Sequence, residues 1–115
     1  MRLIATITGF FLAILISQNV AAQNGWCQLS GAVFVDSNPT RAQYRVYIEE
    51  SESFADLLVF KTINALFADK PGLWFFTSSR AQASVGIILV KERAQADFSI
   101  HFVETESFAG CQTSR

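Results

Sequence analysis

Residues 51–60 read SESFADLLVF, and this stretch decides the fold because parts of it return elsewhere in the same short chain. Near the C-terminus residues 105–110 read TESFAG, and between these two stretches residues 65–69 read ALFAD. A short sequence motif that recurs at a regular spacing is typical of a repeat architecture, in which one small structural unit occurs several times.

Alanine marks the repeat, recurring at intervals of 13, 13, 15, 13 and 13 residues. A small or polar residue follows each alanine, and the longer interval contains the turn sequence Lys70–Pro71–Gly72. The alanines are Ala42, Ala55, Ala68, Ala83, Ala96 and Ala109, and the residues after them are Gln43, Asp56, Asp69, Ser84, Asp97 and Gly110.

Each unit predicts one β-strand of about six residues followed by a connection of about seven, because Val, Ile, Phe and Tyr gather at the same place in every unit. The fold class is therefore all-β. Both parallel and antiparallel strand orders remain open, since seven extended residues can just span the length of one strand. The strand over residues 85–90, VGIILV, is apolar on both faces and is expected to be the most buried. The expected strands are residues 32–36, 44–49, 57–62, 73–77, 85–90 and 98–103.

The connections are expected to be tight corners. Their alanines are expected where neighbouring chain passes too close for a larger side chain, and Phe54, Phe67 and Phe108 just before three of them are expected to fill the core. Asp56, Asp69 and Asp97 are expected to bond to the backbone of their own turns. A calcium site is not expected, because each corner supplies one carboxylate while calcium requires six to eight oxygen ligands; no metal or cofactor is predicted.

The N-terminal residues 1–22 have the layout of a secretory signal peptide: a positive start, an apolar run and small residues before a cut between Ala22 and Gln23. The apolar run is too short to span a bilayer, so no stable membrane anchor is expected after cleavage. Residues 23–115 would then form a single domain in the periplasm or outside the cell.

The chain has two cysteines, Cys27 and Cys111, placed near the two ends of this domain. In an exported protein such a pair predicts a disulfide, which would close nearly the whole domain into one loop. Metal binding would need more ligands than two distant cysteines and one histidine provide.

The repeated motif resembles that of the 7(1) septoil knot domain family. It is carried by residues 55–60 (ADLLVF), by residues 68–76 (ADKPGLWFF) and by the ending 107–110 (SFAG). The resemblance covers about residues 29–110 and implies six short strands wound into a compact closed ring that is deeply knotted. It implies no established enzymatic activity, and it suggests a context of bacterial conflict or defence.

The residues offer little for catalysis. His101 is the only histidine, and the equivalent position in the other repeats holds Phe, Tyr or Ile, so a structural role is expected. With eight basic and ten acidic residues once Arg2 is removed, no basic stripe favours nucleic acid as a partner. The chain is expected to be a non-enzymatic protein-interaction module, with an exported inhibitor or immunity-type protein as the alternative.

Overall fold

The six strands that the sequence repeat predicts all form, a short seventh strand follows them, and short 3₁₀ helices separate most of the strands. The computed structural model describes residues 25–112, so the expected signal peptide and its cut between Ala22 and Gln23 lie outside the described residues. Within this range no helix is both long and apolar enough to cross a membrane. The strands are β1 (Gly31–Val35), β2 (Tyr44–Ile48), β3 (Leu57–Lys61), β4 (Leu73–Phe76), β5 (Val85–Leu89), β6 (Phe98–Phe102) and β7 (Gly110–Cys111).

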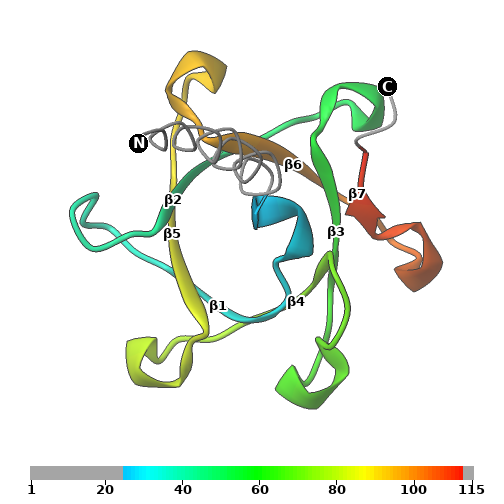
Figure 1. Ribbon diagram of the computed structural model, residues 1–115, viewed down its shortest axis with the longest axis horizontal. Coiled ribbons are helices and arrows are strands. Elements are labelled where there is room, and N and C mark those ends of the chain that lie inside the picture. Colours follow the sequence, from blue (N-terminus) through cyan, green and yellow to red (C-terminus); the bar gives the residue numbers. More distant parts are fainter. Residues whose placement is uncertain (1–24, 113–115) are drawn as a thin grey trace, which may run out of the picture.

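Six of these strands close into a parallel barrel with the order β1-β5-β2-β6-β3-β4 and back to β1 (Figure 1). On a first circuit of the ring the chain forms β1, β2 and β3. On a second circuit it places β4 between β3 and β1, β5 between β1 and β2, and β6 between β2 and β3. The strand order that the sequence leaves open is therefore a parallel, interleaved double winding.

In the parallel pairs that do not involve β4, the first residue of one strand lies opposite the third residue of its neighbour. Leu57 thus pairs with Ile100, and Tyr44 pairs with Ile87. In the pairs of β4, Trp74 lies opposite Gly31 and Leu73 lies opposite Phe60. Just past each barrel strand, one backbone N–H donates to the carbonyl of a completely buried residue in a neighbouring strand, at 2.7–2.9 Å. These six equivalent bonds run from Asp36 to Ile87, Glu49 to Ile100, Thr62 to Trp74, Thr77 to Val33, Val90 to Val46 and Val103 to Val59.

One side chain from the centre of each strand forms the central layer of the barrel interior, as the alternation of strand side chains requires. These six side chains are completely buried: Val33, Val46, Val59, Trp74, Ile87 and Ile100. The next residue of each strand faces outward and is half-buried, as Phe34 and Phe60 show. Leu57, Val85 and Phe98 at the strand starts belong to the same core as the central layer.

The strand at 85–90 is not the most buried, contrary to the sequence-based prediction. Leu89 of β5 is 42% exposed, whereas β3 and β6 each begin with three consecutive buried residues. The reason is position: Leu89 lies at the end of its strand, at the rim of the barrel, and β3 has β7 as an additional partner.

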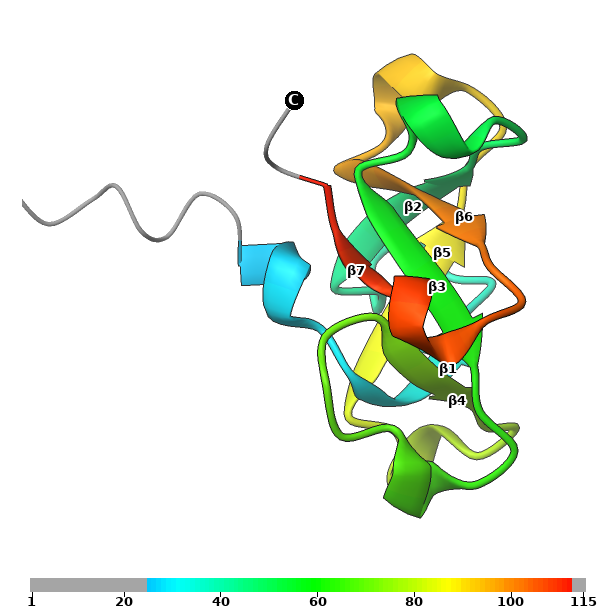
Figure 2. The ribbon, with the colours of Figure 1, turned by 90° about the vertical axis from the view of Figure 1, so that its right-hand side faces the viewer.

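One end of the barrel is covered by residues 25–28, which form a short helical turn beside the strand starts (Figure 2). Trp26 stacks on Phe98 with ring centroids 4.8 Å apart, and Tyr44 meets the same phenylalanine edge-on. Cys27 and Cys111 form the predicted disulfide here, with Cα atoms 5.2 Å apart. We call this the sealed end.

The corners project outward from the ring (Figure 1), and their phenylalanines do not fill the core as the sequence suggests. Phe54, Phe67 and Phe108 are 61%, 57% and 61% exposed, because each ends a 3₁₀ helix at the tip of a corner. The alanine that follows each helix turns back toward the barrel. Ala55 and Ala68 are buried, and Ala42, Ala83, Ala96 and Ala109 are half-buried.

The corner aspartates bond to other strands instead of to their own turns. Asp56 Oδ2 accepts the Ser99 N–H at 2.9 Å, while the Asp56 N–H donates to the Ser99 carbonyl at 3.1 Å. Asp97 makes the same reciprocal pair with Arg45, with both distances 2.7 Å. The carboxylate takes the place of the next carbonyl in the parallel ladder and so extends the pairing by one residue.

Asp69 does not extend the strand pairing in this way, although it occupies the same position of the sequence repeat. The insertion at residues 70–72 separates it from the start of β4, and Ala68 has ψ 65° where Ala55 has ψ 147°. Over residues 25–112 the Asp69 side chain has no hydrogen bond or ion pair and is exposed. This position of the repeat therefore contains two kinds of aspartate.

This difference predicts the outcome of two substitutions. Asp56→Ala is expected to lower the free energy of unfolding by about 1–3 kcal/mol, because it leaves the buried Ser99 N–H without its carboxylate acceptor. Asp69→Ala is expected to change it by less than about 0.5 kcal/mol, as is usual for a surface residue. Chemical denaturation of both variants checks this. Equal effects would contradict the ladder role of Asp56.

Candidate functional site

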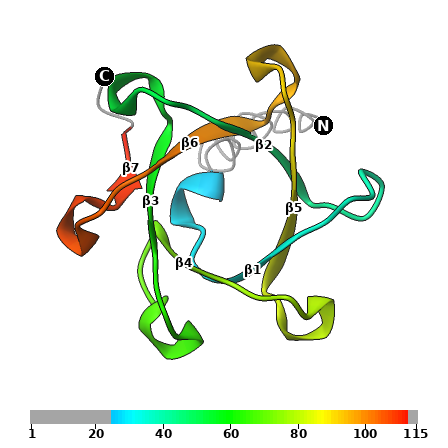
Figure 3. The ribbon, with the colours of Figure 1, turned by 180° about the vertical axis from the view of Figure 1, so that it is seen from behind.

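The end of the barrel opposite the sealed end carries an apolar rim, which we call the open mouth. It consists of the fifth residue of each strand, or the fourth in β4, and these residues recur at the same spacing as the alanines. Val35, Ile48 and Leu89 are 42%, 39% and 42% exposed. Figure 3 views the ring from this side. The open mouth comprises Val35, Ile48, Lys61, Phe76, Leu89 and Phe102.

The aromatic side chains of the open mouth meet across one side of the barrel. The Phe76 and Phe102 rings pack edge-on with centroids 6.0 Å apart, although their strands are separated by β3. Lys61 of β3 places its ammonium 4.5 Å from the centre of the Phe102 ring. On the opposite side of this rim Val35, Ile48 and Leu89 remain partly exposed.

Beside the open mouth lies the corner with the most exposed apolar side chains of the described chain. The 3₁₀ helix η5 (Ala65–Phe67) and the residues before it present Ile63 at 88%, Leu66 at 80% and Phe67 at 57% exposure. Asn64 caps this helix, since its Oδ1 accepts the Leu66 N–H at 2.9 Å. The apolar side chains are thus displayed on an ordered turn, which we call the η5 corner.

A groove of about 440 Å³ connects the η5 corner with the open mouth. Lys61 belongs to both the groove and the mouth, so the groove adjoins the mouth at this residue. The groove walls carry charges of both signs. Its lining residues are Phe60, Lys61, Thr62, Ile63, Phe67, Asp69, Lys70 and Glu106.

The groove opens where an otherwise repeated ion pair is absent. Asp36, after β1, pairs with Arg80 at 2.7 Å, and Glu49, after β2, pairs with Arg93 in the equivalent way. Both arginines begin a 3₁₀ helix, η6 (Arg80–Gln82) or η7 (Arg93–Gln95). At the third equivalent place, after β3, Thr62 replaces the acid and Glu106 replaces the arginine at the start of η8 (Glu106–Phe108).

Asp36 is the one buried carboxylate among the described residues. The Asn38 backbone N–H, which donates to its Oδ1 at 2.9 Å, lowers the pKa of Asp36 below the usual 3.8. Burial acts in the opposite direction, and the charges of Arg80 and Arg41 add to the lowering. The carboxylate stays ionised and holds the first corner against the fourth.

Asp36→Asn is therefore expected to melt at a lower temperature than the wild type at pH 7. A lowered pKa in the folded state contributes stability above the unfolded value of 3.8, and this is lost as pH falls through the folded value. The difference in melting temperature should accordingly shrink below pH 3.8. Thermal melts between pH 7 and pH 2 measure it, with Asp69→Asn as an exposed control; a difference that stays constant with pH would refute the role of the charge.

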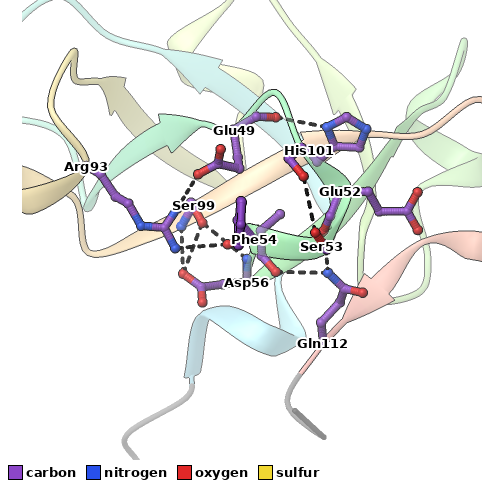
Figure 4. Close-up of polar contacts among 11 residues, drawn as sticks. Glu49, Glu52, Ser53, Phe54, Asp56, Arg93, Ser99, His101 and Gln112 are labelled. Carbon is purple, nitrogen blue, oxygen red and sulfur yellow. Dashed lines mark hydrogen bonds and ion pairs between the residues drawn. The ribbon is translucent and has the colours of Figure 1, made fainter.

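The remaining polar groups tie corners together (Figure 4). Arg93 donates to the Phe54 carbonyl at 2.9 Å besides pairing with Glu49, and Gln112 donates to the carbonyls of Glu52 and Ala55. His101, half-buried, has its Nδ1 2.9 Å from the Glu49 carbonyl oxygen. Apart from the Arg93–Glu49 pair, each of these contacts joins a side chain to the backbone of another unit. In residues 25–112 no three His, Cys, Asp or Glu side chains gather as metal ligands.

The fold and this surface define a small disulfide-closed β-barrel in which parallel strands from two circuits of the chain alternate. Residues 27–112 match the family described as 7(1) septoil knot domain, and the chain belongs to that family. No curated protein and no solved structure matches it. The resemblance inferred from the repeated ADLLVF motif is thereby confirmed, as is the knotted all-β fold.

Sequence reasoning missed the open mouth, although a signal for it exists. Its residues occupy the same position in every repeat, two residues after the completely buried residue at the centre of each strand. They therefore recur at the same intervals as the alanines. Apolar residues at the last position of a short strand look like core, and the alternation places them on the inner side. Only the closed geometry shows that this layer lies at an end of the barrel where Val35, Ile48 and Leu89 stay partly exposed among the described residues.

Proposed function

We propose that this chain is an exported, non-enzymatic protein-interaction module that binds a partner through the open mouth and the η5 corner. The observation that carries the proposal is the set of exposed apolar side chains at these two places: Val35, Ile48 and Leu89 at the open mouth, and Ile63, Leu66 and Phe67 at the η5 corner. Exposed apolar patches of this kind on small proteins are typical of protein contacts. The disulfide is consistent with an oxidising compartment.

The contrast between the two ends of the barrel supports this assignment. The sealed end has Trp26 stacked on Phe98, whereas the open mouth carries partly exposed aliphatic side chains. The rigid capped turn of the η5 corner reduces the conformational entropy lost when its side chains are fixed in a complex. Lys61, Lys70 and Glu106 on the groove provide charges for orienting a partner.

A second function is favoured by the shape of the η5 corner. Leu66 is 80% exposed on this outward corner and does not line the groove, which suits insertion into the cleft of another protein. An exported inhibitor or immunity-type protein would use the same surface in this way. The identity of the partner separates the two functions, because an inhibitor binds a hydrolase or toxin.

Site-specific photocrosslinking in the source cells tests the proposal. A photoreactive residue at position 66 of the full chain should give a discrete adduct with one protein, and Leu89→Lys in the same chain should abolish it. The matched control carries the probe at Ala81, which holds the same position in helix η6 and is exposed. Identical adducts from both positions, or no effect of Leu89→Lys, would refute binding at this surface.

A further inference from the structure

The disulfide joins the two ends of the wound chain. Cys27 precedes β1, and Cys111 lies in β7, which pairs with the start of β3. The two cysteines are 84 residues apart, so the covalent ring that they close contains all six barrel strands and every connection between them. Nothing of the interleaved winding lies outside this ring.

The path of the chain cannot be undone once such a ring is closed. The chain makes two circuits, and the strands of the second circuit lie between those of the first. Each connection leaves one end of the barrel, passes outside the ring and returns to the other end, as the outward corners show (Figures 1 and 3). Because all six strands are parallel, every passage through the ring has the same direction. A closed curve that circles a ring twice while winding through it in one direction three or more times is knotted, and no bending opens it.

We propose that the Cys27–Cys111 disulfide seals the knot, so that oxidation is productive only after the chain has been threaded. Once sealed, the chain keeps its knot even when fully unfolded. A chain oxidised before threading becomes an unknotted ring with the same covalent structure, and this ring is barred from the native fold. Reduction of the disulfide is the only covalent step that releases it without cutting the backbone.

The sealing step is a two-electron oxidation. The thiols of Cys27 and Cys111 lose two electrons and two protons as the sulfur–sulfur bond forms, and a small disulfide such as oxidised glutathione accepts them and becomes two thiols. Threading must therefore precede this exchange in the compartment where the protein folds. The proposal concerns folding alone and does not depend on the proposed partner.

Two preparations of the full chain with the same disulfide but different histories test the proposal. The first is folded, oxidised and then unfolded in concentrated guanidinium without reductant. The second is made by chemical synthesis, kept in guanidinium throughout and oxidised there at high dilution, so that it has never folded. Both are diluted into buffer without thiols, and recovery of tryptophan fluorescence and near-ultraviolet circular dichroism is followed.

The first preparation should recover its native signal almost completely, and the second should recover none of it. Addition of a thiol reductant followed by re-oxidation should then restore the second preparation, because the reduced chain is free to thread. In the Cys27→Ser/Cys111→Ser double variant the two histories should give the same recovery. Equal recovery of the two oxidised preparations, or failure of reduction to rescue the second, would overturn the proposal.

Discussion

In chemical denaturation, Trp74→Ala should unfold with a free energy about 4 kcal/mol below that of the wild-type chain, in the range found for large aromatic residues removed from cores. Trp74 is completely buried and is the largest side chain in the central layer of the barrel. Its indole N–H donates to the Leu29 carbonyl at 3.1 Å. The substitution removes the filling of the barrel and leaves that carbonyl without this partner.

Two further variants separate these contributions. Trp74→Phe retains most of the apolar volume and loses the hydrogen bond, so its cost should be clearly smaller than that of alanine. Trp26→Ala removes a tryptophan that covers the sealed end and is only half-buried, and it too should cost less. A Trp74→Ala variant as stable as Trp26→Ala would contradict the description of the barrel interior.

Gly72→Ala is expected to cost about 3 kcal/mol, because a tight contact adds about 1–3 and the backbone conformation about 1–2. Gly72 has φ +87°, a conformation that side chains disfavour. An added Cβ would lie 2.6 Å from the Gly110 nitrogen and 2.7 Å from the Leu58 carbonyl oxygen. Both are backbone atoms, which cannot rotate away.

The position explains why this glycine is critical. Gly72 begins the second circuit, where its N–H donates to the Leu29 carbonyl and its carbonyl accepts the Phe60 N–H. Gly110→Ala is the matched control, since Gly110 also has a positive φ, +138°, but a Cβ there meets nothing within 4 Å. Its cost should be confined to conformational strain, about 1 kcal/mol. Equal melting midpoints for the two variants would contradict the close approach at Gly72.

The position of each strand could be predicted from the sequence because the period of the repeat is nearly constant. Val46, Val59, Ile87 and Ile100 lie in one column of the sequence and in one layer of the barrel. The order of the strands could not be predicted, because it depends on which neighbouring strand each connection passes. The length of a connection alone permits several strand orders, both parallel and antiparallel. The insertion at residues 70–72 marks the place where β3 and β4 become direct neighbours.

Corner residues were harder to predict, for a physical reason. Phe54 and Phe67 look like core residues because phenylalanine is usually buried, yet a 3₁₀ helix at the tip of each corner directs them outward. The aspartates bond across 43 or 52 residues of sequence, as Asp56–Ser99 and Asp97–Arg45 show. The residue types in a turn do not predict such contacts, since the contacts depend on which strands become neighbours.

The interleaved winding is tested most directly by nuclear magnetic resonance couplings across backbone hydrogen bonds, which identify donor and acceptor residues without a structure calculation. The account predicts couplings from the Asp36 amide to the Ile87 carbonyl, from Glu49 to Ile100 and from Thr77 to Val33, the bonds that join strands of different circuits. Couplings of the β2 amides to β1 or β3, its neighbours in sequence, would show a simple meander and contradict the double winding.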